Sequence, residues 1–314
     1  MKRLLVPLFA LFALISCAPE AAHTPWRYAA LAPDSLPGPY RRVVAAETVH
    51  AALIRELGAE ESIVGVCDAA YVADSALRAL LSSGRMADFG SCLAPDVERI
   101  AAARPDAVLL SAVEGADRGA FAALQVPVVG LSDHMEAHPL ARAEWARVIG
   151  RLVGRAAQAD SLFSQVEARY DSLCRIARTL PAHPRLLTDL PQGGAWYVPG
   201  GESYLARLYR DAGFLLPCSS GSRAGSVPLS VEQVVASAAD ADLWLIKYAA
   251  PADLTYAELL RQCPFAPRIK AFRERRVLGC NTLRCPYYEQ TPFHPDLLLQ
   301  DLLQGSLRYF QPLR

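Results

Sequence analysis

The sequence predicts an α/β protein with two Rossmann-like lobes, each built on a central sheet, and one long rigid α-helix joining them. Strand-like apolar runs alternate with helical patterns over residues 40–138, and the same alternation returns over residues 181–314. Between them, residues 157–179 contain no Gly or Pro and carry an apolar stripe of helical period. Such a helix spans roughly 30 to 35 Å, about the width of a small domain. We therefore expect a ligand cleft between the lobes. The alternative is that residues 157–179 form an ordinary surface helix within one larger domain.

The composition excludes several classes of protein. The 314 residues are 52% hydrophobic and 20% charged, which is typical of a folded chain with sizeable cores. Lys plus Arg and Asp plus Glu both number 32, so the electrostatic footprint of a nucleic-acid-binding protein is missing. After the N-terminus, no apolar run is long enough to span a membrane.

The N-terminus carries an export signal. Lys2 and Arg3 precede an apolar run from residue 4 to residue 15, too short for a stable span and typical of a signal peptide. The run ends in Leu-Ile-Ser-Cys, which resembles the bacterial lipobox. We therefore interpret residues 1–16 as a lipoprotein signal peptide and Cys17 as the lipid-bearing residue, with plain secretion as the alternative. Residues 17–39 are rich in Ala and Pro, which favours a tether.

The first lobe, residues 40–138, shows four strand signals separated by helical patterns. The expected strands are residues 42–46, 62–67, 107–111 and 127–131, and the expected helices are residues 47–57, 76–83 and 96–104. Short loops between alternating elements favour a parallel sheet covered on both faces. Ligands of such sheets bind beyond the carboxyl ends of the strands, so polar residues there are expected at a cleft rim. These are Glu47, Thr48, Cys67, Asp68, Ser111, Ser132 and Asp133.

Residues 139–180 form the helical linker, which includes the long helix at residues 157–179. The second lobe, residues 181–314, then repeats the alternation. The expected strands are residues 185–190, 195–198, 243–247 and 276–279, and helices are expected at residues 202–212, from Ser230 onward and at residues 296–309. Ser230 and Gln233 have the spacing of a capping box.

Seven cysteines follow Cys17, and an exported chain sits where disulfides form. Cys67 and Cys92 both follow strand-like runs of the first lobe and could be neighbours, which makes them a candidate disulfide pair. Cys280 and Cys285 bracket a short loop. No CxxC pair occurs, which makes a structural zinc site improbable.

Three long runs carry a family resemblance: VVAAETVHAALIRELGAEESIVGVCD, FGSCLAPDVERIAAARPDAVLLS and VPLSVEQVVASAADADLWLI. Their order and spacing resemble the periplasmic substrate-binding proteins of ABC importers for cobalamin, haem and ferric siderophores, the class with a helical backbone. The resemblance covers residues 40–312. An E-x-[IV]-x5-D pattern occurs once per lobe, and WYVPGGES and YYEQTPFHPDLLLQDL resemble the Bacteroidota lipoprotein branch.

The resemblance implies a binding protein rather than an enzyme. It would hold no intrinsic cofactor, bind a corrinoid, ferric siderophore or haem, and deliver it to an ABC permease dimer with its ATPase subunits. It would work as a monomer, lipid-anchored at the periplasmic face of the inner membrane, with outer-membrane or surface display left open. Glu98 and Glu232 align with the family's two permease-docking glutamates, one per lobe. Each also sits early in an expected helix, where the helix dipole alone favours an acidic side chain.

Aromatic and cationic residues near the expected cleft are candidates for ligand contact, because a planar chelate needs aromatic faces and its anionic groups need Arg or Lys. The candidates are Trp196, Tyr197, Tyr248, Arg284, Tyr287 and Tyr288, with Phe89 and Arg223 as weaker ones. Burial of these aromatic rings in the lobe cores is the alternative. Ser226 and Val227 stand where a cobalamin binder would carry another aromatic residue, which weakens a strict cobalamin interpretation.

Two other functions remain open. His134 and His138, with Asp133 and Glu136 close by, have a spacing that on a helix would suit a metal such as zinc, although Pro139 follows at once. A metal-cofactor enzyme on the same scaffold is the third hypothesis. No GxSxG, HExxH or catalytic Cys-Gly-x-Cys pattern supports catalysis.

Overall fold

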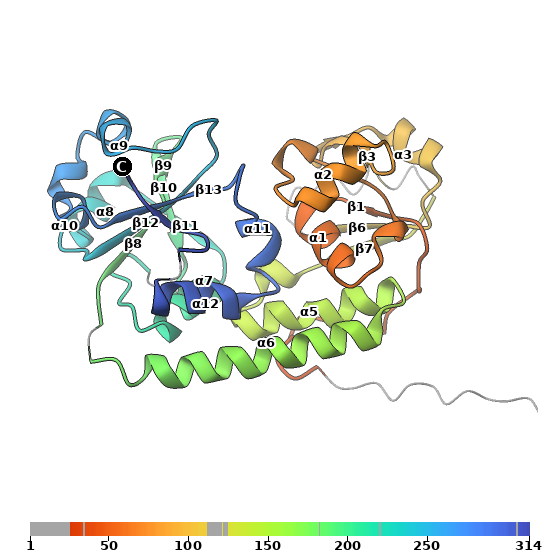
Figure 1. The fold of residues 1–314 in the computed structure, drawn as a ribbon, viewed down its shortest axis with the longest axis horizontal. Helices are drawn as coiled ribbons and strands as arrows, with labels where there is room; N and C mark the ends of the chain where they lie inside the picture. Colours follow the sequence, from red (N-terminus) through yellow and green to blue (C-terminus); the bar gives the residue numbers. More distant parts are fainter. Residues whose placement is uncertain are drawn as a thin grey trace, which may run out of the picture.

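The computed structural model describes residues 26–33, 35–111, 121, 125–181, 183–219, 221–305 and 307–314. The expected signal peptide and Cys17 lie outside these residues. Two α/β lobes stand on a pair of helices, α5 (Pro139–Leu152) and α6 (Ala156–Ala177), as Figure 1 shows. The predicted fold class is therefore confirmed. Among the described helices none is long and apolar enough to cross a membrane.

The N-terminal lobe is built on a five-stranded parallel sheet of order β3-β2-β1-β6-β7. The four strands expected from the sequence are present, and β6 is buried at every residue because helices and loops cover both faces. Its strands are β1 (Val43–Ala45), β2 (Ile63–Val66), β3 (Ala87–Asp88), β6 (Ala107–Ser111) and β7 (Val128–Leu131), with a β4 (Gly90–Ser91) and β5 (Ala94–Pro95) hairpin. Its helices are α1 (Thr48–Glu56), α2 (Ser75–Ser82) and α3 (Val97–Ala103), with 3-10 turns η1 (Glu60–Ser62), η2 (Ala69–Tyr71) and η3 (Asp133–Met135).

The C-terminal lobe holds two sheets rather than one. Parallel strands β8 (Leu186–Thr188), β12 (Leu243–Tyr248) and β13 (Val277–Asn281) are joined by antiparallel β14 (Gln311–Pro312) in the order β14-β13-β12-β8. A separate antiparallel sheet contains β9 (Pro191–Gln192), β10 (Ala195–Pro199) and β11 (Ser226–Leu229). The strand at residues 195–198 was predicted from the sequence. Its position in a separate antiparallel sheet was not predicted.

Six helices and the turn η4 (Ala266–Arg268) complete the described part of this lobe. The capping box of Ser230 and Gln233 is present. The last helix ends at residue 304 instead of residue 309, because Gly305 takes a left-handed conformation that ends it. The helices are α7 (Tyr204–Asp211), α8 (Val231–Ser237), α9 (Tyr256–Gln262), α10 (Lys270–Arg273), α11 (Tyr287–Gln290) and α12 (Pro295–Gln304).

The connection between the lobes is a packed pair of helices, not the single helix that the sequence suggested. A Cβ built on Gly150 of α5 would stand 2.4 Å from Cβ of Ala159 on α6, so the glycine permits this close approach. All but one of the α5 residues are buried, whereas α6 packs one side against α5 and α12 and leaves the other exposed. The long helix predicted for residues 157–179 is thus confirmed to within two residues at each end.

The part of the expected tether that the structure describes is docked on α5. Residues 26–31, which we call the strap, place consecutive backbone N–H groups on two buried carboxylates. Glu144 accepts bonds from residues 27, 28 and 29, and Glu136 accepts bonds from residues 30 and 31. This stretch is therefore bound to the folded body.

A second connection joins the lobes at α11 and the turn after it. The Glu289 carboxylate accepts backbone N–H bonds from Ala73 (3.1 Å) and Asp74 (2.8 Å) of the N-terminal lobe. Phe293 belongs to the core of that lobe, and His294 Nε2 lies 2.9 Å from Glu56 of α1. Figure 1 shows α11 between the two lobes. The lobes therefore meet through side chains as well as through the helix pair.

Candidate ligand-binding cleft

Two adjoining cavities, of about 410 and 350 Å³, lie between the lobes. They share Gln192, Lys247 and Tyr288 in their walls, and we refer to the two together as the cleft. The first is bounded mainly by the C-terminal lobe and the start of α5, and the second lies between the two lobes. Their size falls in the range of small-molecule sites.

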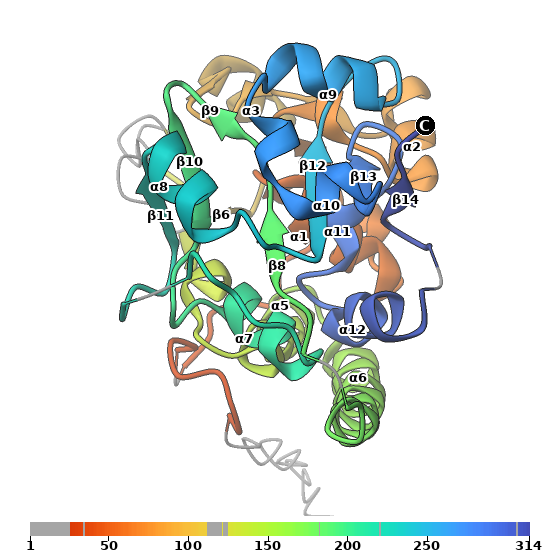
Figure 2. The ribbon, with the colours of Figure 1, turned by 90° about the vertical axis from the view of Figure 1, so that its left-hand side faces the viewer.

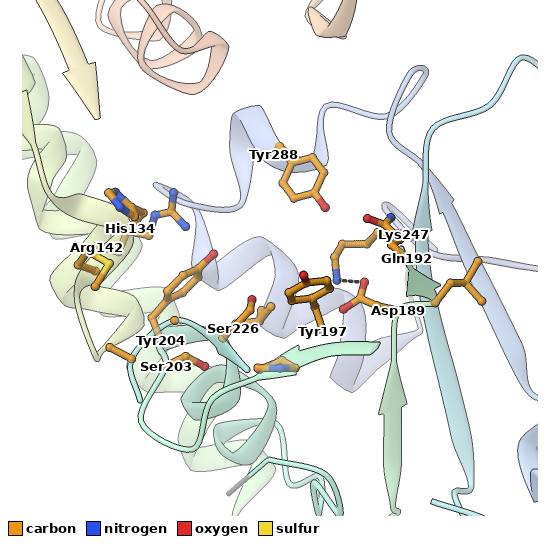
Figure 3. Close-up of a pocket in the computed structure, with 16 residues that line it drawn as sticks. His134, Arg142, Asp189, Gln192, Tyr197, Ser203, Tyr204, Ser226, Lys247 and Tyr288 are labelled. Carbon is orange, nitrogen blue, oxygen red and sulfur yellow. Dashed lines mark ion pairs between the residues drawn. The ribbon is translucent and has the colours of Figure 1, made fainter. Parts of the chain in front are cut away.

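The first cavity combines aromatic rings with cations (Figure 3). Tyr197 of β10 and Tyr288 of α11 are 49% and 55% exposed, so their ring faces are available to a ligand. Tyr204 begins α7 after the N-cap Ser203. Together with Arg142 and Lys247, these side chains offer stacking surfaces and positive charge in one space.

Lys247 is a second cation of this cavity beside Arg142, and only 8% of its side chain is exposed. It stands near the carboxyl end of β12, and its Nζ lies 2.5 Å from Oδ1 of Asp189. Burial opposes its charge, but the carboxylate of Asp189 outweighs burial and raises the pKa of Lys247 above its usual value. The ammonium group therefore stays charged beneath the cleft.

Arg142 is held in place from two sides. Its Nε donates to Oδ2 of Asp133 at 3.0 Å, and its guanidinium carbon lies 4.6 Å from the ring centre of Tyr204. Figure 3 shows the guanidinium group turned toward the cavity. A guanidinium fixed in this way is suited to pairing with a carboxylate or phenolate of a ligand.

A buried charged network supports Arg142 from the N-terminal lobe. His50 of α1 is fully buried and lies between Asp133 (Nε2 to Oδ1, 3.1 Å) and Glu47 (Nδ1 to Oε2, 3.2 Å). Burial opposes the charge of His50, but hydrogen bonds to both carboxylates raise its pKa to about 9. Burial likewise opposes ionisation of Asp133, and Arg142 and His50 hold its pKa well below the usual range. The network thus alternates carboxylates and cations.

The stabilisation that His50 provides is expected to depend on pH. Its folded pKa of about 9 exceeds the ordinary value of 6.5, so this stabilisation is complete below pH 6.5 and is lost as pH rises through 9. We expect the free energy of unfolding to fall by roughly 3 kcal/mol between pH 6.5 and pH 10 through this group. Urea unfolding at several pH values measures it, with His50→Gln as the reference. An equal slope for the wild type and this variant would contradict the assignment.

The second cavity is more acidic. Glu47, Asp68 and Glu289 line it, together with Tyr71 and Tyr248. Burial raises the pKa of Glu289 to about 7, against the lowering effect of its backbone hydrogen bonds. Tyr71 ends η2, just after β2, and is 59% exposed. A ligand filling both cavities would therefore touch both lobes.

Three of the ligand-contact candidates line the cleft: Tyr197, Tyr248 and Tyr288. Arg284 lines a different cavity, where it pairs with Asp253 at 3.2 Å, and Arg223 is exposed but lines none of the cavities described.

Trp196, Tyr287 and Phe89 are buried, so the structure corrects these three predictions. Successive residues of a strand face opposite sides, which sends Trp196 into the core against Trp244 and leaves Tyr197 in the cleft.

Three cleft residues, Tyr71, Tyr204 and Arg142, were not predicted from the sequence. Tyr71 lies five residues after the carboxyl end of β2. Ligands bind beyond the carboxyl ends of parallel strands, so the position that indicated Asp68 as a cleft residue could also have indicated Tyr71. Arg142 lies on a helix that the sequence placed in the linker, and no local pattern marks it as a cleft residue. Only the packing of α5 beneath the cleft brings it there.

Cys67 and Cys92 are both free thiols, so the candidate disulfide between them is not formed in this structure. Sγ of Cys92 instead lies 3.8 Å from Oε1 of Glu47. Burial raises the pKa of both thiols to about 12, and Glu47 adds to the effect. Such thiols are poor nucleophiles.

The residues of the zinc hypothesis are engaged elsewhere. His138 caps α5 by accepting the N–H of Leu140, and Asp133 and Glu136 serve the charged network and the strap. Among the described residues, no group of three or more His, Cys, Asp or Glu is placed to hold a metal ion. Of the four residues of this hypothesis, only His134 lines the first cavity.

Glu98 and Glu232 lie on different lobes, each as the second residue of its helix. Each is exposed in the first turn of a seven-residue helix, α3 or α8. Neither makes an ion pair with the described residues. Their carboxylates are therefore open to a partner.

The sequence matches the family model of the periplasmic binding proteins over residues 43–282. The fold is similar to a periplasmic heme-binding protein from Pseudomonas aeruginosa, with 21% identity and a TM-score of 0.66 over 88% of this chain and 95% of that one. It is also similar to an ABC-type Fe3+-hydroxamate transport protein from Saccharomonospora viridis, with 20% identity and a TM-score of 0.65 over 84% and 93% of the two chains.

An uncharacterized lipoprotein of Methanocaldococcus jannaschii is 22% identical over 223 residues, which is 66% of this chain. The chain spans about half, 52%, of the length of that relative.

Proposed function

The chain belongs to the periplasmic binding protein family, and on that premise we propose that it captures a metal chelate outside the cytoplasm and delivers it to an ABC importer. The chelate is a corrinoid, a ferric siderophore or haem. The family is one of binding proteins, and we infer that the chain has no catalytic role and no intrinsic cofactor.

The observation that carries the proposal is the combination of exposed tyrosine rings and fixed cations in the interlobe cleft. Tyr197, Tyr204 and Tyr288 offer faces for a macrocycle or a catecholate ring. Arg142 and Lys247 offer charge to carboxylates or phenolates. The names of two structural relatives, one a heme-binding protein and one of an Fe3+-hydroxamate transport system, support a metal chelate as the ligand.

We propose that the partner is a permease dimer with its ATPase subunits. Glu98 and Glu232 would dock one lobe each onto arginines of the permease, since paired carboxylates fix orientation as well as affinity. Cys17 would anchor the protein by lipid to the periplasmic face of the inner membrane, with the outer membrane or cell surface as the other locations. The lipoprotein name of the Methanocaldococcus jannaschii relative supports the anchor.

The proposal is tested by absorption spectroscopy. The purified protein is titrated separately with haemin, cyanocobalamin and a ferric hydroxamate, and the metal-centred bands are followed. We expect one chelate to give a saturable spectral change at micromolar concentration. If none of the three forms a complex, the proposal is wrong, and zinc titration by thermal shift then tests the direct metal-binding alternative.

Removing two cleft rings is expected to weaken binding of that chelate. At about 1–1.5 kcal/mol per ring, Tyr197→Ala with Tyr288→Ala lowers affinity roughly 30- to 150-fold. Both side chains are half exposed, so the fold should tolerate their loss. Leu93→Ala, at an exposed hairpin tip, is the matched control and should bind like the wild type. Unchanged affinity in the double variant would place the ligand elsewhere.

A further inference from the structure

The strap is bound through its main chain to two buried carboxylates. Glu144 is fully buried, and its oxygens accept three backbone N–H groups, at 2.7–3.0 Å, and Nη1 of Arg147 at 2.9 Å. Glu136 is nearly as buried and accepts two more backbone N–H groups and the indole N–H of Trp145. Buried carboxylates satisfied in this way hold their donors strongly. The path of the strap is therefore fixed.

The strap also contacts α6. The hydroxyl of Tyr28 donates to Oε1 of Glu167 at 2.8 Å, and Nη1 of Arg27 lies 2.5 Å from the same atom. In Figures 1 and 2 the strap lies with α5 and α6 along the lower edge of the molecule, whereas α3 lies on the upper side. The N-terminal end of the described chain is thus attached on the side away from α3.

This attachment limits how far the body can move from a lipid on Cys17. Trp26 follows Cys17 by nine residues, and a fully extended chain of that length reaches at most about 32 Å. The limit rests on the lipid anchor of the proposed function. A body held so closely by its helical edge keeps that edge toward the anchoring membrane.

The exposed side of α6 has the chemistry of a membrane contact. Near the end of the helix, Ile176 is 47% exposed and lies between the exposed Arg175 and Arg178, and Leu180, just after the helix, is 41% exposed. Arg178 shares a cavity wall with Leu215, which is 50% exposed. We call these five residues the α6 patch. Neither arginine of the patch makes an ion pair with the described residues, and Asp171 is the exposed carboxylate nearest along the helix.

Several exposed residues of α6 before the patch are uncharged: Ala157, Ser161, Gln165, Ala168 and Ser172. Two exposed residues are charged: Arg169, which pairs with Asp296, and Asp171. The strap contacts α6 at Glu167, and the patch lies about 14 Å further along the helix. This distance is shorter than the reach of the tether, about 32 Å.

We propose that the α6 patch and the strap lie on the anionic lipid surface of the membrane that carries the Cys17 anchor, so that the cleft opens away from that membrane. Arginines near a surface of anionic headgroups gain electrostatic attraction, and the apolar side chains between them enter the interface. In this arrangement the cleft faces incoming ligand.

The arrangement has a consequence for delivery. Docking α3 onto a permease in the same membrane requires the body to turn over, which the short tether opposes. Ala32 and Leu36 also pack against the core of the N-terminal lobe. Release of the strap together with these contacts moves the first fixed point to Tyr40, whose N–H is bonded to the carbonyl of Leu152. The reach from Cys17 then rises to about 80 Å. The strap therefore sets which way the anchored protein faces.

Tryptophan fluorescence tests the proposal directly. Trp145, Trp196 and Trp244 are buried, so quenching by brominated lipids reports on Trp26 at the start of the strap. The lipoprotein, extracted from membranes, is reconstituted into brominated vesicles of phosphatidylglycerol or of phosphatidylcholine. We expect strong quenching in phosphatidylglycerol and weak quenching in phosphatidylcholine.

The matched variants are two pairs of exposed arginines. In the first pair, Arg175→Gln with Arg178→Gln, each lost arginine should lower the ratio of membrane-facing to free molecules about five-fold, which is about 25-fold for the two. Quenching of Trp26 should then fall to the level seen in phosphatidylcholine. Arg99→Gln with Arg268→Gln, on α3 and η4, should quench like the wild type. Chelate affinity should be unchanged in both pairs.

Other outcomes overturn the proposal. If mass spectrometry shows a lipidated Cys17 but Trp26 is not quenched, or is quenched equally in all variants, the orientation is wrong while the proposed binding function stands. A dimer that dissociates on Ile176→Glu would assign the patch to a second copy of the chain. Absence of lipid on Cys17 overturns both the anchor and this inference, and the chelate titration then tests the binding function separately.

Discussion

Replacing Asp133 with alanine is expected to lower the free energy of unfolding by about 3–5 kcal/mol. Asp133 is buried and is shared by two cations, His50 at 3.1 Å and Arg142 at 3.0 Å. Removing the carboxylate leaves both cations in a low-dielectric interior, with only Glu47 to neutralise His50. Urea unfolding at pH 7 measures the loss, and ligand affinity should fall as well because Arg142 loses the partner that orients it.

The control is an ion pair of similar geometry at the surface. Asp253 and Arg284 lie 3.2 Å apart and are both more than half exposed. Asp253→Ala should cost less than about 1 kcal/mol, since water screens exposed pairs. If Asp133→Ala cost no more than this control, the charged network would not be a structural element of the cleft.

The second large effect is expected on transport. Glu98→Ala with Glu232→Ala should reduce chelate uptake by cells at least about 100-fold while leaving chelate affinity unchanged. Each carboxylate bonded to an arginine of a permease contributes about 1.5–3 kcal/mol, and the loss of two exceeds 100-fold in the docked population. Uptake of radiolabelled chelate and in vitro titration measure the two quantities separately.

Glu61→Ala with Glu274→Ala is the matched control for this experiment. Both residues are exposed carboxylates, one on each lobe, outside α3 and α8. The control should transport normally. Equal uptake by the docking and control variants would remove Glu98 and Glu232 from the permease interface.

The elements that periodicity predicts are those whose packing is local. The fully buried run at residues 107–111 and the long apolar stripe of α6 appear where expected. A continuous apolar run fits a strand covered on both faces, and a stripe of helical period fits a helix packed on one side. The capping box at Ser230 is equally local. These signals, with the alternation of strands and helices, were enough to give the fold class.

The cleft was only partly predictable, because its residues depend on how elements pack. Because side chains alternate along β10, Tyr197 faces the cleft and Trp196 faces the core. The sequence alone does not indicate which of the two faces of this strand is turned toward the cleft. Arg142 enters the cleft through the packing of α5 beneath both lobes. The strap was missed because its main-chain N–H groups, which any residue supplies, make the contacts with Glu136 and Glu144.

The central claim, that a metal chelate binds between the lobes, is tested most directly by anomalous scattering. Crystals grown with the chelate that gives the spectral change are measured at the absorption edge of its metal. We predict one strong anomalous peak in the interlobe cleft, within contact distance of a chelate whose ring lies against Tyr197, Tyr204 or Tyr288. A peak between His134 and His138 without a chelate, or one outside the cleft, would contradict the account.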